Sequence, residues 1–124
     1  MIFRTRKLIR PEHLNPRGTL FGGIVMKWID EEAAIYASCQ LDTSSLVTKL
    51  ISELDFVAPA RNGDIVEIGT SVVSIGRTSI VLSMEVRNKT TKETIVKVDK
   101  IVFVHVDETG RPAPHGVTVA KEDK

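Results

Sequence analysis

The sequence contains a single cysteine, Cys39, among its 124 residues. One thiol excludes an intrachain disulfide framework and a zinc site built from several cysteines. Because no obvious base accompanies it near the end of a predicted helix, we expect a buried and inert thiol. The 3 histidines, His13, His105 and His115, do not have the spacing of a metal site, so no metal is expected.

An excess of charge of either sign is also missing, as are long apolar runs. Lysine and arginine total 17 against 16 acidic residues, for a net charge of +1. Without a local basic cluster, neither nucleic acid nor an anionic membrane is an expected partner. The longest charge-free stretches, residues 18–26 and 33–41, are far shorter than the roughly 20 residues of a transmembrane helix. The amino end lacks the pattern of a secretory signal, so we expect a cytoplasmic protein.

The length and composition allow one domain. Hydrophobic residues make up 42% and charged residues 27% of the chain, which is typical of a globular domain of about 100–150 residues. We therefore predict a single domain over residues 1–124, with a tail from about residue 113 that we expect to be flexible. Pro112 and Pro114 argue against a further central strand in this tail.

One segment has a strong helical pattern, from about Gly22 to Gln40. At about 100° per residue, apolar side chains cover most of its circumference and leave only Lys27 and Glu31 on a narrow polar strip. This pattern predicts a long helix that is buried on most sides.

The rest of the chain has the period of two that is typical of strands. A long strand has Leu46, Leu50 and Phe56 on one face, and Pro59 ends it. Together with residues 2–10, 65–75, 78–87 and 94–106, it makes about five antiparallel strands. On the last strand Lys100 interrupts a face of valines, so either a bulge occurs there or the amine has a partner.

A long helix that follows the first strand and is wrapped by an antiparallel sheet is an α+β arrangement. This description fits the hotdog fold.

The start of the helix is the first candidate for chemistry. Gly22 and Gly23 each cost about 1 kcal/mol of helix stability relative to alanine, yet they leave the first amide N–H groups uncovered. With the helix dipole, these amides would polarise a carbonyl and stabilise an oxyanion. A plain tight turn that packs against a strand is the alternative, and the glycines alone do not distinguish the two.

Asp30 and Asn15 are the other candidate residues. On the helical wheel Asp30 lies beside Met26 and Ala34 rather than on the polar strip. It could be a buried carboxylate that accepts hydrogen bonds from a loop, or a general base or nucleophile acting within the chain or across a symmetric dimer. Asn15 could form a turn or orient a water molecule.

These residues belong to a longer set of motifs. In chain order the set is Asn15, Gly18, Leu20, Phe21, Gly22 and Gly23, then Trp28, Ile29, Asp30 and Ala33, then Phe56, Val57, Ala58, Pro59, Gly63 and Asp64, then Gly76, Arg77, Thr78 and Ser79. The set resembles the hotdog-fold acyl-CoA thioesterases over nearly the whole chain. One departure is Ala58, where many relatives have an arginine before the proline.

The resemblance implies hydrolysis of an acyl-CoA thioester to free acid and coenzyme A, with no cofactor beyond the coenzyme A of substrate and product. By this likeness Asp30 would activate water or attack the thioester, Asn15 would position water, and the Gly22 and Gly23 amides would polarise the carbonyl. Relatives build this site between two subunits, which implies a homodimer or a dimer-based oligomer such as a hexamer.

The resemblance also implies that Gly76, Arg77, Thr78 and Ser79 contact coenzyme A, while an ordinary hairpin turn is the alternative. Two other activities fit the same fold. A non-enzymatic acyl-CoA binding or sensing module would usually need a DNA-binding segment, for which the chain has no spare length. A dehydratase would need a histidine paired with an acid, and only His13 lies near the helix start.

Overall fold

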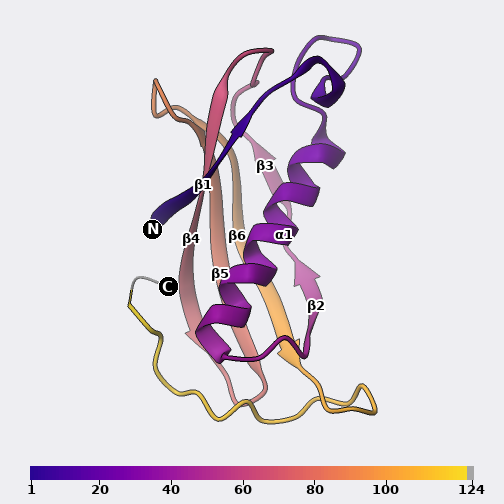
Figure 1. The fold of residues 1–124 in the computed structure, drawn as a ribbon, viewed down its shortest axis with the longest axis vertical. Helices are drawn as coiled ribbons and strands as arrows, with labels where there is room; N and C mark the ends of the chain where they lie inside the picture. The colour runs from indigo at the N-terminus through magenta and orange to yellow at the C-terminus, as the bar shows by residue number, and fades with distance from the viewer. Residues whose placement is uncertain (123–124) are drawn as a thin grey trace.

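The computed structural model describes residues 1–122 of the chain. One long helix, one short 3-10 helix and six strands follow one another along it (Figure 1). In order they are β1 (Ile2–Leu8), η1 (Pro11–His13), α1 (Gly22–Leu41), β2 (Leu46–Ile51), β3 (Leu54–Phe56), β4 (Ile65–Ile75), β5 (Ser79–Asn88) and β6 (Thr94–His105). The predicted helix is therefore confirmed to within a residue at each end.

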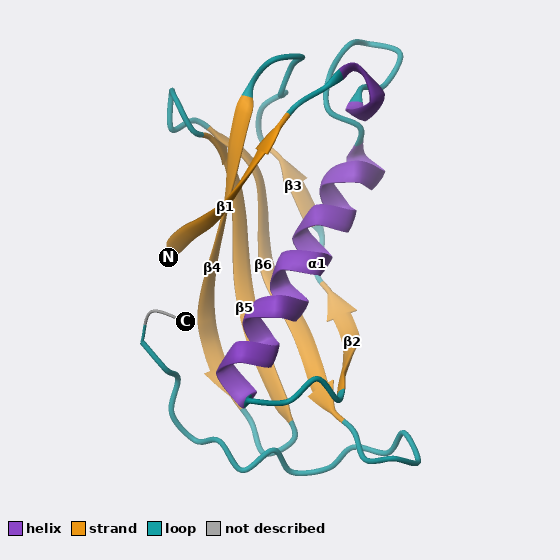
Figure 2. Ribbon diagram, viewed as in Figure 1, coloured by secondary structure: helices purple, strands orange, loops and turns teal. Residues whose placement is uncertain are grey.

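The six strands form one antiparallel sheet in the order β1-β4-β5-β6-β2, with β3 also paired to β6. Figure 2 shows α1 lying along one face of this sheet, roughly parallel to the length of the strands. The α+β class and the hotdog arrangement are confirmed.

The predicted long strand ended by Pro59 is wrong in one respect, because it is divided into β2 and β3. Both pieces pair with β6, through Ile51 opposite Ile101 and Leu54 opposite Val98. Between them the amide of Lys100 donates to the hydroxyl of Ser52 instead of to a backbone carbonyl. The ladder is thus interrupted, and the sheet has six strands rather than about five.

The interruption coincides with a β-bulge on β6. Opposite the single residue Ser83 of β5, β6 places two residues, Asp99 and Lys100. The bulge explains why Lys100 stands among valines: both bulged residues are exposed, and the inward positions then move to Ile101 and Phe103, which are 0% and 2% exposed. The expected continuous valine face does not cross the bulge.

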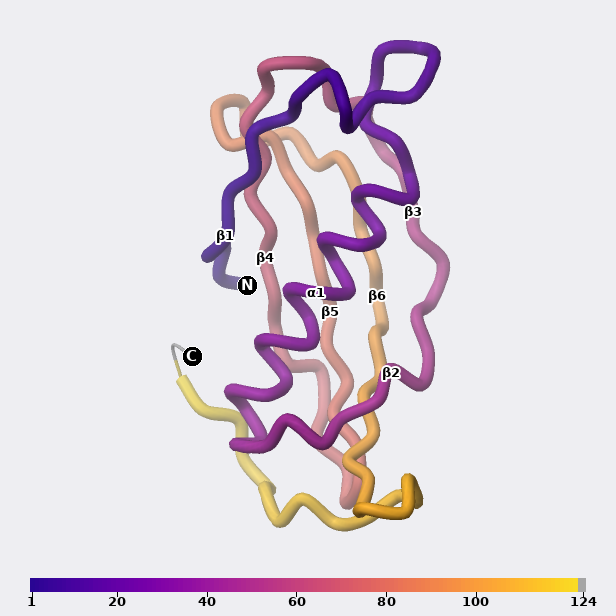
Figure 3. Tube along the Cα trace, turned by 45° about the vertical axis from the view of Figure 1, so that its right-hand side comes forward, coloured from indigo at the N-terminus to yellow at the C-terminus, as the bar shows by residue number. Residues whose placement is uncertain are grey.

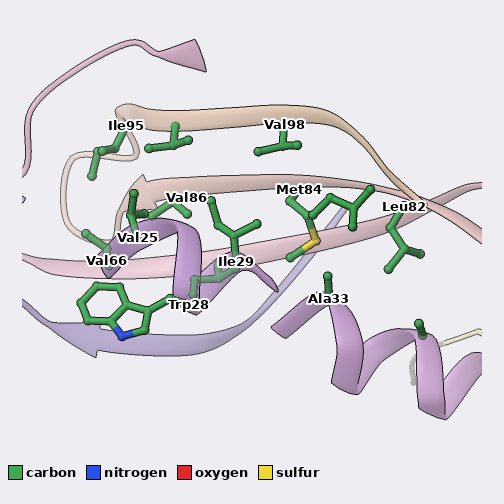
Figure 4. Packing of buried hydrophobic residues seen from close by; sticks show 14 of the residues in the cluster. Val25, Trp28, Ile29, Ala33, Val66, Leu82, Met84, Val86, Ile95 and Val98 are labelled. Carbon is green, nitrogen blue, oxygen red and sulfur yellow. The ribbon is translucent and has the colours of Figure 1, made fainter. Parts of the chain in front are cut away.

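The core lies between α1 and the sheet (Figure 4). Val25, Ile29 and Ala33 of the helix are fully buried, and Leu82 and Met84 of β5 meet them from the sheet. Burial of a side chain such as leucine stabilises the fold by about 1.5–3 kcal/mol. This packing fixes which side of α1 faces the sheet.

The other side of α1 is open, which corrects the expectation of a helix buried on most sides. Met26 and Ile35 are 45% and 57% exposed. Further large apolar side chains are exposed along residues 46–57, the segment that forms one edge of the sheet. This edge segment carries Val47, Leu50, Phe56 and Val57. A single chain therefore leaves an apolar surface uncovered beside its helix.

The segment after β6 runs across the end of the sheet and returns to the helix (Figure 3). We call residues 113–121 the strap. At one end the amide of Ala113 donates to the carbonyl of His105. At the other end the buried side chain of Gln40 exchanges two hydrogen bonds with the backbone of Lys121, at 2.7 and 3.0 Å. The flexibility expected of the tail from about residue 113 stays a prediction. The last two residues of this tail, 123 and 124, lie outside the described part of the chain.

Candidate active site

The helix start presents two uncommitted backbone donors. Phe21 is the N-cap of α1 and makes no side-chain capping bond. Its carbonyl accepts from the amides of Ile24 and Val25. The amides of Gly22 and Gly23 find no acceptor within residues 1–122. These two N–H groups stand at the positive end of the helix dipole, where a carbonyl oxygen or an anion is favoured.

The two glycines also allow aromatic rings to come close. A Cβ added to Gly22 would lie 3.4 Å from Cζ of Phe56, and one added to Gly23 would lie 3.4 Å from Cε1 of Phe21. The close packing expected of a tight turn is therefore present together with the free amides. Packing and ligand binding are compatible explanations of these glycines.

Asn15 organises the loop that leads into the helix. Its Oδ1 accepts from the amides of Arg17 and Thr19, at 2.9 and 3.2 Å, and its Nδ2 donates to the hydroxyl of Thr19 at 3.0 Å. The carbonyl oxygen of this side chain is thus occupied by the turn, as its position before Pro16 predicts.

A cavity of about 400 Å³ lies beside this loop. Asn15 and Gly22 line one side of it, and Phe56, Pro59 and Ile95 line the other. Its size falls within the range of small-molecule pockets. The structure thus brings two of the predicted site residues, Asn15 and Gly22, to one cavity.

Asp30 lies apart from this cavity. It is half-buried on the flank of α1 that faces β2, where Oδ1 accepts from the hydroxyl of Thr48 at 3.1 Å. Asp30 is eight residues beyond Gly22, or about 12 Å along the helix axis at 1.5 Å per residue. A single chain therefore does not bring the carboxylate to the glycine amides.

Thr48 was not identified from the sequence as the hydrogen-bond partner of Asp30. The available signal was a hydroxyl on the same predicted strand face as Leu46 and Leu50. That signal is weak, because a threonine is an ordinary strand residue.

The turn that contains Gly76, Arg77, Thr78 and Ser79 joins β4 to β5. Figure 1 shows it at the opposite end of the sheet from the start of α1. The amide of Gly76 donates to the carbonyl of Ser79 at 2.9 Å, which closes the turn. A second cavity, of about 340 Å³, lies between this turn and the strap. The predicted coenzyme A contact and the predicted catalytic residues are therefore separate within one chain.

The thiol and the histidines give no second catalytic centre. Cys39 is exposed, which corrects the expectation of a buried thiol. His13 packs edge-on against Trp28, with ring centroids 4.9 Å apart, and its Nδ1 accepts from the amide of Arg10. No group of three or more histidine, cysteine and acidic side chains within residues 1–122 is arranged to hold a metal ion. No helix in this part of the chain has the length and apolarity to cross a membrane.

Comparisons with known proteins match the chain to one superfamily. The family model of the thioesterase superfamily matches residues 17–95. The acyl-CoA thioester hydrolase YciA of Salmonella typhimurium (strain LT2) is 32% identical over 115 residues, which cover 88% of this chain and 86% of that protein.

Solved structures agree with the sequence relatives. The hexameric thioesterase of Yersinia pestis superposes with a TM-score of 0.81 at 27% identity, over 91% of this chain and 93% of that one. The acyl-CoA hydrolase of Staphylococcus aureus, in complex with butyryl coenzyme A and coenzyme A, superposes with a TM-score of 0.83 at 27% identity, over 96% and 71% of the two chains.

Proposed function

Since this chain belongs to the thioesterase superfamily and is an acyl-CoA thioester hydrolase, we propose that its active site forms between two copies of the chain. The separation of Asp30 from the glycine amides carries this proposal, because about 12 Å of helix lies between them. Asp30 of one copy would then act on a carbonyl held by Gly22 and Gly23 of the other.

The apolar edge segment gives the second copy a place to bind. Val47, Leu50 and Phe56 are 48%, 50% and 53% exposed, and β2 and β3 have no neighbouring strand on their outer side in the described chain. An exposed apolar sheet edge is a surface that proteins normally cover. Asp30 lies next to this edge, since its partner Thr48 belongs to β2. The Yersinia pestis relative is hexameric, which supports an oligomer of this chain, and the apolar edge is the contact that we propose for it.

The proposed reaction follows from these groups. The amides of Gly22 and Gly23 would donate to the thioester carbonyl and stabilise the negative charge that develops on its oxygen. The Asp30 carboxylate would take a proton from water as the water attacks the carbonyl carbon, or would itself attack and form an anhydride that water then opens. Either route breaks the C–S bond, leaves the acid, and transfers a proton to the departing coenzyme A thiolate.

The other predicted residues complete the proposed site. Asn15 would orient the water through its Nδ2 group, because its Oδ1 is held by the loop. Gly76, Arg77, Thr78 and Ser79 would contact the coenzyme A moiety. Coenzyme A is then part of substrate and product, and the proposed reaction uses no further cofactor. We place this activity in the cytoplasm.

The decisive variant is Asp30→Asn. It keeps the shape of the side chain and an acceptor for Thr48, but it removes the base or nucleophile. We expect kcat for a panel of acyl-CoA thioesters to fall by about 10²–10⁴-fold, with unchanged melting temperature and oligomeric state. Free thiol released per second is the measurement. Glu31→Gln, one residue further along the helix and exposed, is the matched control and should keep the wild-type rate.

A wild-type rate in Asp30→Asn would contradict the assignment. A single turnover in ¹⁸O-water tests the nucleophile route. If water opens the anhydride at the aspartyl carbonyl, the first product stays unlabelled and ¹⁸O enters the aspartate, which a base cannot produce. A base places ¹⁸O in the product acid, and so does an anhydride that water opens at the acyl carbon, so ¹⁸O in the aspartate is the diagnostic result.

A further inference from the structure

The strap contacts the β4–β5 turn through one histidine. The backbone amide of His115 donates to the carbonyl of Arg77 at 3.3 Å, and its Nε2 lies 3.0 Å from the carbonyl of Ser79. Its other ring nitrogen, Nδ1, accepts from the amide of Val117 at 3.0 Å. A carbonyl only accepts and an amide only donates, so Nε2 is the ring nitrogen that donates to Ser79 and Nδ1 is the one that accepts from Val117.

This histidine bonds the carbonyl that closes the turn. The oxygen of Ser79 accepts both from the amide of Gly76 and from His115. The carbonyl of Thr78 in turn accepts from the amide of His105 at 2.7 Å. Three successive carbonyl groups of the turn, those of Arg77, Thr78 and Ser79, are therefore occupied by the strap or by β6.

The groups left over in the turn are donors. Within the described chain, the amides of Arg77 and Thr78 have no acceptor, and the side chain of Arg77 is exposed. Two backbone N–H groups and a guanidinium are the groups that bind a phosphate. Because the carbonyl oxygens would repel a phosphate, their hydrogen bonds to the strap and to β6 favour the anion.

The strap also forms a wall of the cavity at this turn. The cavity of about 340 Å³ is lined by Gly76 and Arg77 on one side and by Gly116 and Val117 on the other. His115 lies next in sequence to these strap residues and is half-buried. It therefore sets the spacing between the two walls.

We propose that His115 is a positioning residue for acyl-CoA binding, which holds the β4–β5 turn in the shape that presents its N–H groups to a phosphate of the coenzyme A moiety. The inference rests on the proposed role of this turn in coenzyme A binding. His115 acts through Ser79 and Arg77 and takes no part in the chemical step.

The first test is His115→Ala in the full-length protein. Loss of the hydrogen bond to Ser79 should raise KM for acyl-CoA by about 3- to 10-fold and leave kcat within about twofold. An acyl-N-acetylcysteamine thioester has the same reacting bond but no nucleotide or phosphate. Its KM should be the same for the variant and the wild type.

Two conservative variants separate positioning from a general effect on stability. His115→Gln places an NH₂ donor near the position of Nε2 and should restore KM for acyl-CoA to within about twofold of the wild type. His115→Asn can accept only locally, from the amide of Val117, and should have the raised KM of His115→Ala. If His115→Ala does not fold, the comparison of these two variants decides the question, and equal KM values overturn the inference.

Two further variants complete the set. Val119→Ala, on the same strap and 75% exposed, is the control and should have the wild-type KM for acyl-CoA.

Arg77→Ala should raise KM for acyl-CoA through direct loss of a cation. If it does so while folded His115→Ala keeps the wild-type KM, the positioning role is wrong and the proposed function stands. If Arg77→Ala has no effect, the turn does not bind coenzyme A and the inference fails with that assignment. If the wild type hydrolyses no acyl-CoA, the proposed function itself fails.

Discussion

Glu67 has the densest set of charged partners in the described chain. Its side chain is only 4% exposed and lies 2.7 Å from Nη2 of Arg87, with Arg6 and Lys92 each at 3.6 Å. The hydrogen bond from Arg87 lowers the pKa of Glu67, burial opposes this shift, and the charges of Lys92, Arg87 and Arg6 lower the pKa further. The folded state therefore favours the ionised carboxylate.

A lowered pKa makes this carboxylate a source of stability that depends on pH. Its contribution is present above the ordinary pKa of 4.5 and is lost as the pH falls through that value toward the lower folded-state pKa. We expect Glu67→Gln to lower the free energy of unfolding at pH 7 by about 1–2 kcal/mol. The difference from the wild type should shrink below about pH 4.

Urea unfolding at pH 7 and at pH 3.5 measures both effects. Glu108→Gln, an exposed carboxylate in a turn, is the control and should change little at either pH. If Glu67→Gln lowers the free energy of unfolding equally at pH 7 and at pH 3.5, the role of the charge is contradicted.

At the level of single residues, the sequence predicted one part of the site and not another. The helical wheel places Asp30 on the flank of the helix and away from the polar strip, and the structure agrees. Its partner Thr48 could not be found in this way. Thr48 keeps the period of two with Leu46, but the irregularity in the pairing of β2 with β6, between Thr48 and Leu50, moves Leu50 off the face predicted for all three, so the pattern did not single out Thr48. Such shifts leave no reliable mark in a period-two pattern.

Among the elements, β6 deviates most from its sequence pattern. The lysine that interrupts its valines is a correct sign of irregularity, but two explanations fitted it equally. Only the pairing with β5 distinguishes them, because Ser83 faces two residues of β6. The expectation of one continuous valine face was consequently wrong, since the bulge moves the inward positions to Ile101 and Phe103.

The start of α1 gives a prediction at the scale of elements. Gly22→Ala would place a methyl group 3.4 Å from Cζ of Phe56, a ring that is 53% exposed and can shift. We expect the free energy of unfolding to change by less than about 1 kcal/mol, because alanine also favours helix. The methyl group would nevertheless intrude on the cavity that Gly22 lines and displace the thioester carbonyl. We expect kcat to fall by about 10- to 100-fold.

Thermal unfolding and steady-state hydrolysis of the same preparation check this prediction. A wild-type kcat in a stably folded Gly22→Ala protein would show that the glycine serves packing alone.

For the whole molecule, the apolar edge segment tests whether a single chain is enough for activity. Leu50→Lys places a charge on the exposed apolar edge beside Asp30, so we expect a folded monomer whose hydrolysis rate is at least about 100-fold lower. Light scattering and circular dichroism measure assembly and fold. Leu8→Lys is the matched control, because Leu8 is 49% exposed, against 50% for Leu50, and lies on β1 at the opposite edge of the sheet. A Leu50→Lys monomer with full activity would contradict the shared site.

The sequence could predict one helix, its limits and the antiparallel sheet, because each has its own periodicity. It could not predict which side of the helix stays open. An almost completely apolar helix is predicted to be buried on most sides when it is considered alone. Only the position of the sheet shows that Met26 and Ile35 stay exposed in a single chain.

The strap has a consequence for the order of events during synthesis. The buried amide of Gln40 takes both of its partners from Lys121, which follows it by 81 residues. At translation rates of about 5–20 residues per second, Lys121 is made about 4–16 s after Gln40. The helix and all six strands are therefore complete before this amide can be satisfied. A chain that ends after β6 would have a nearly finished sheet with a polar group exposed at the end of its helix, where a chaperone or a protease could distinguish it from the finished protein.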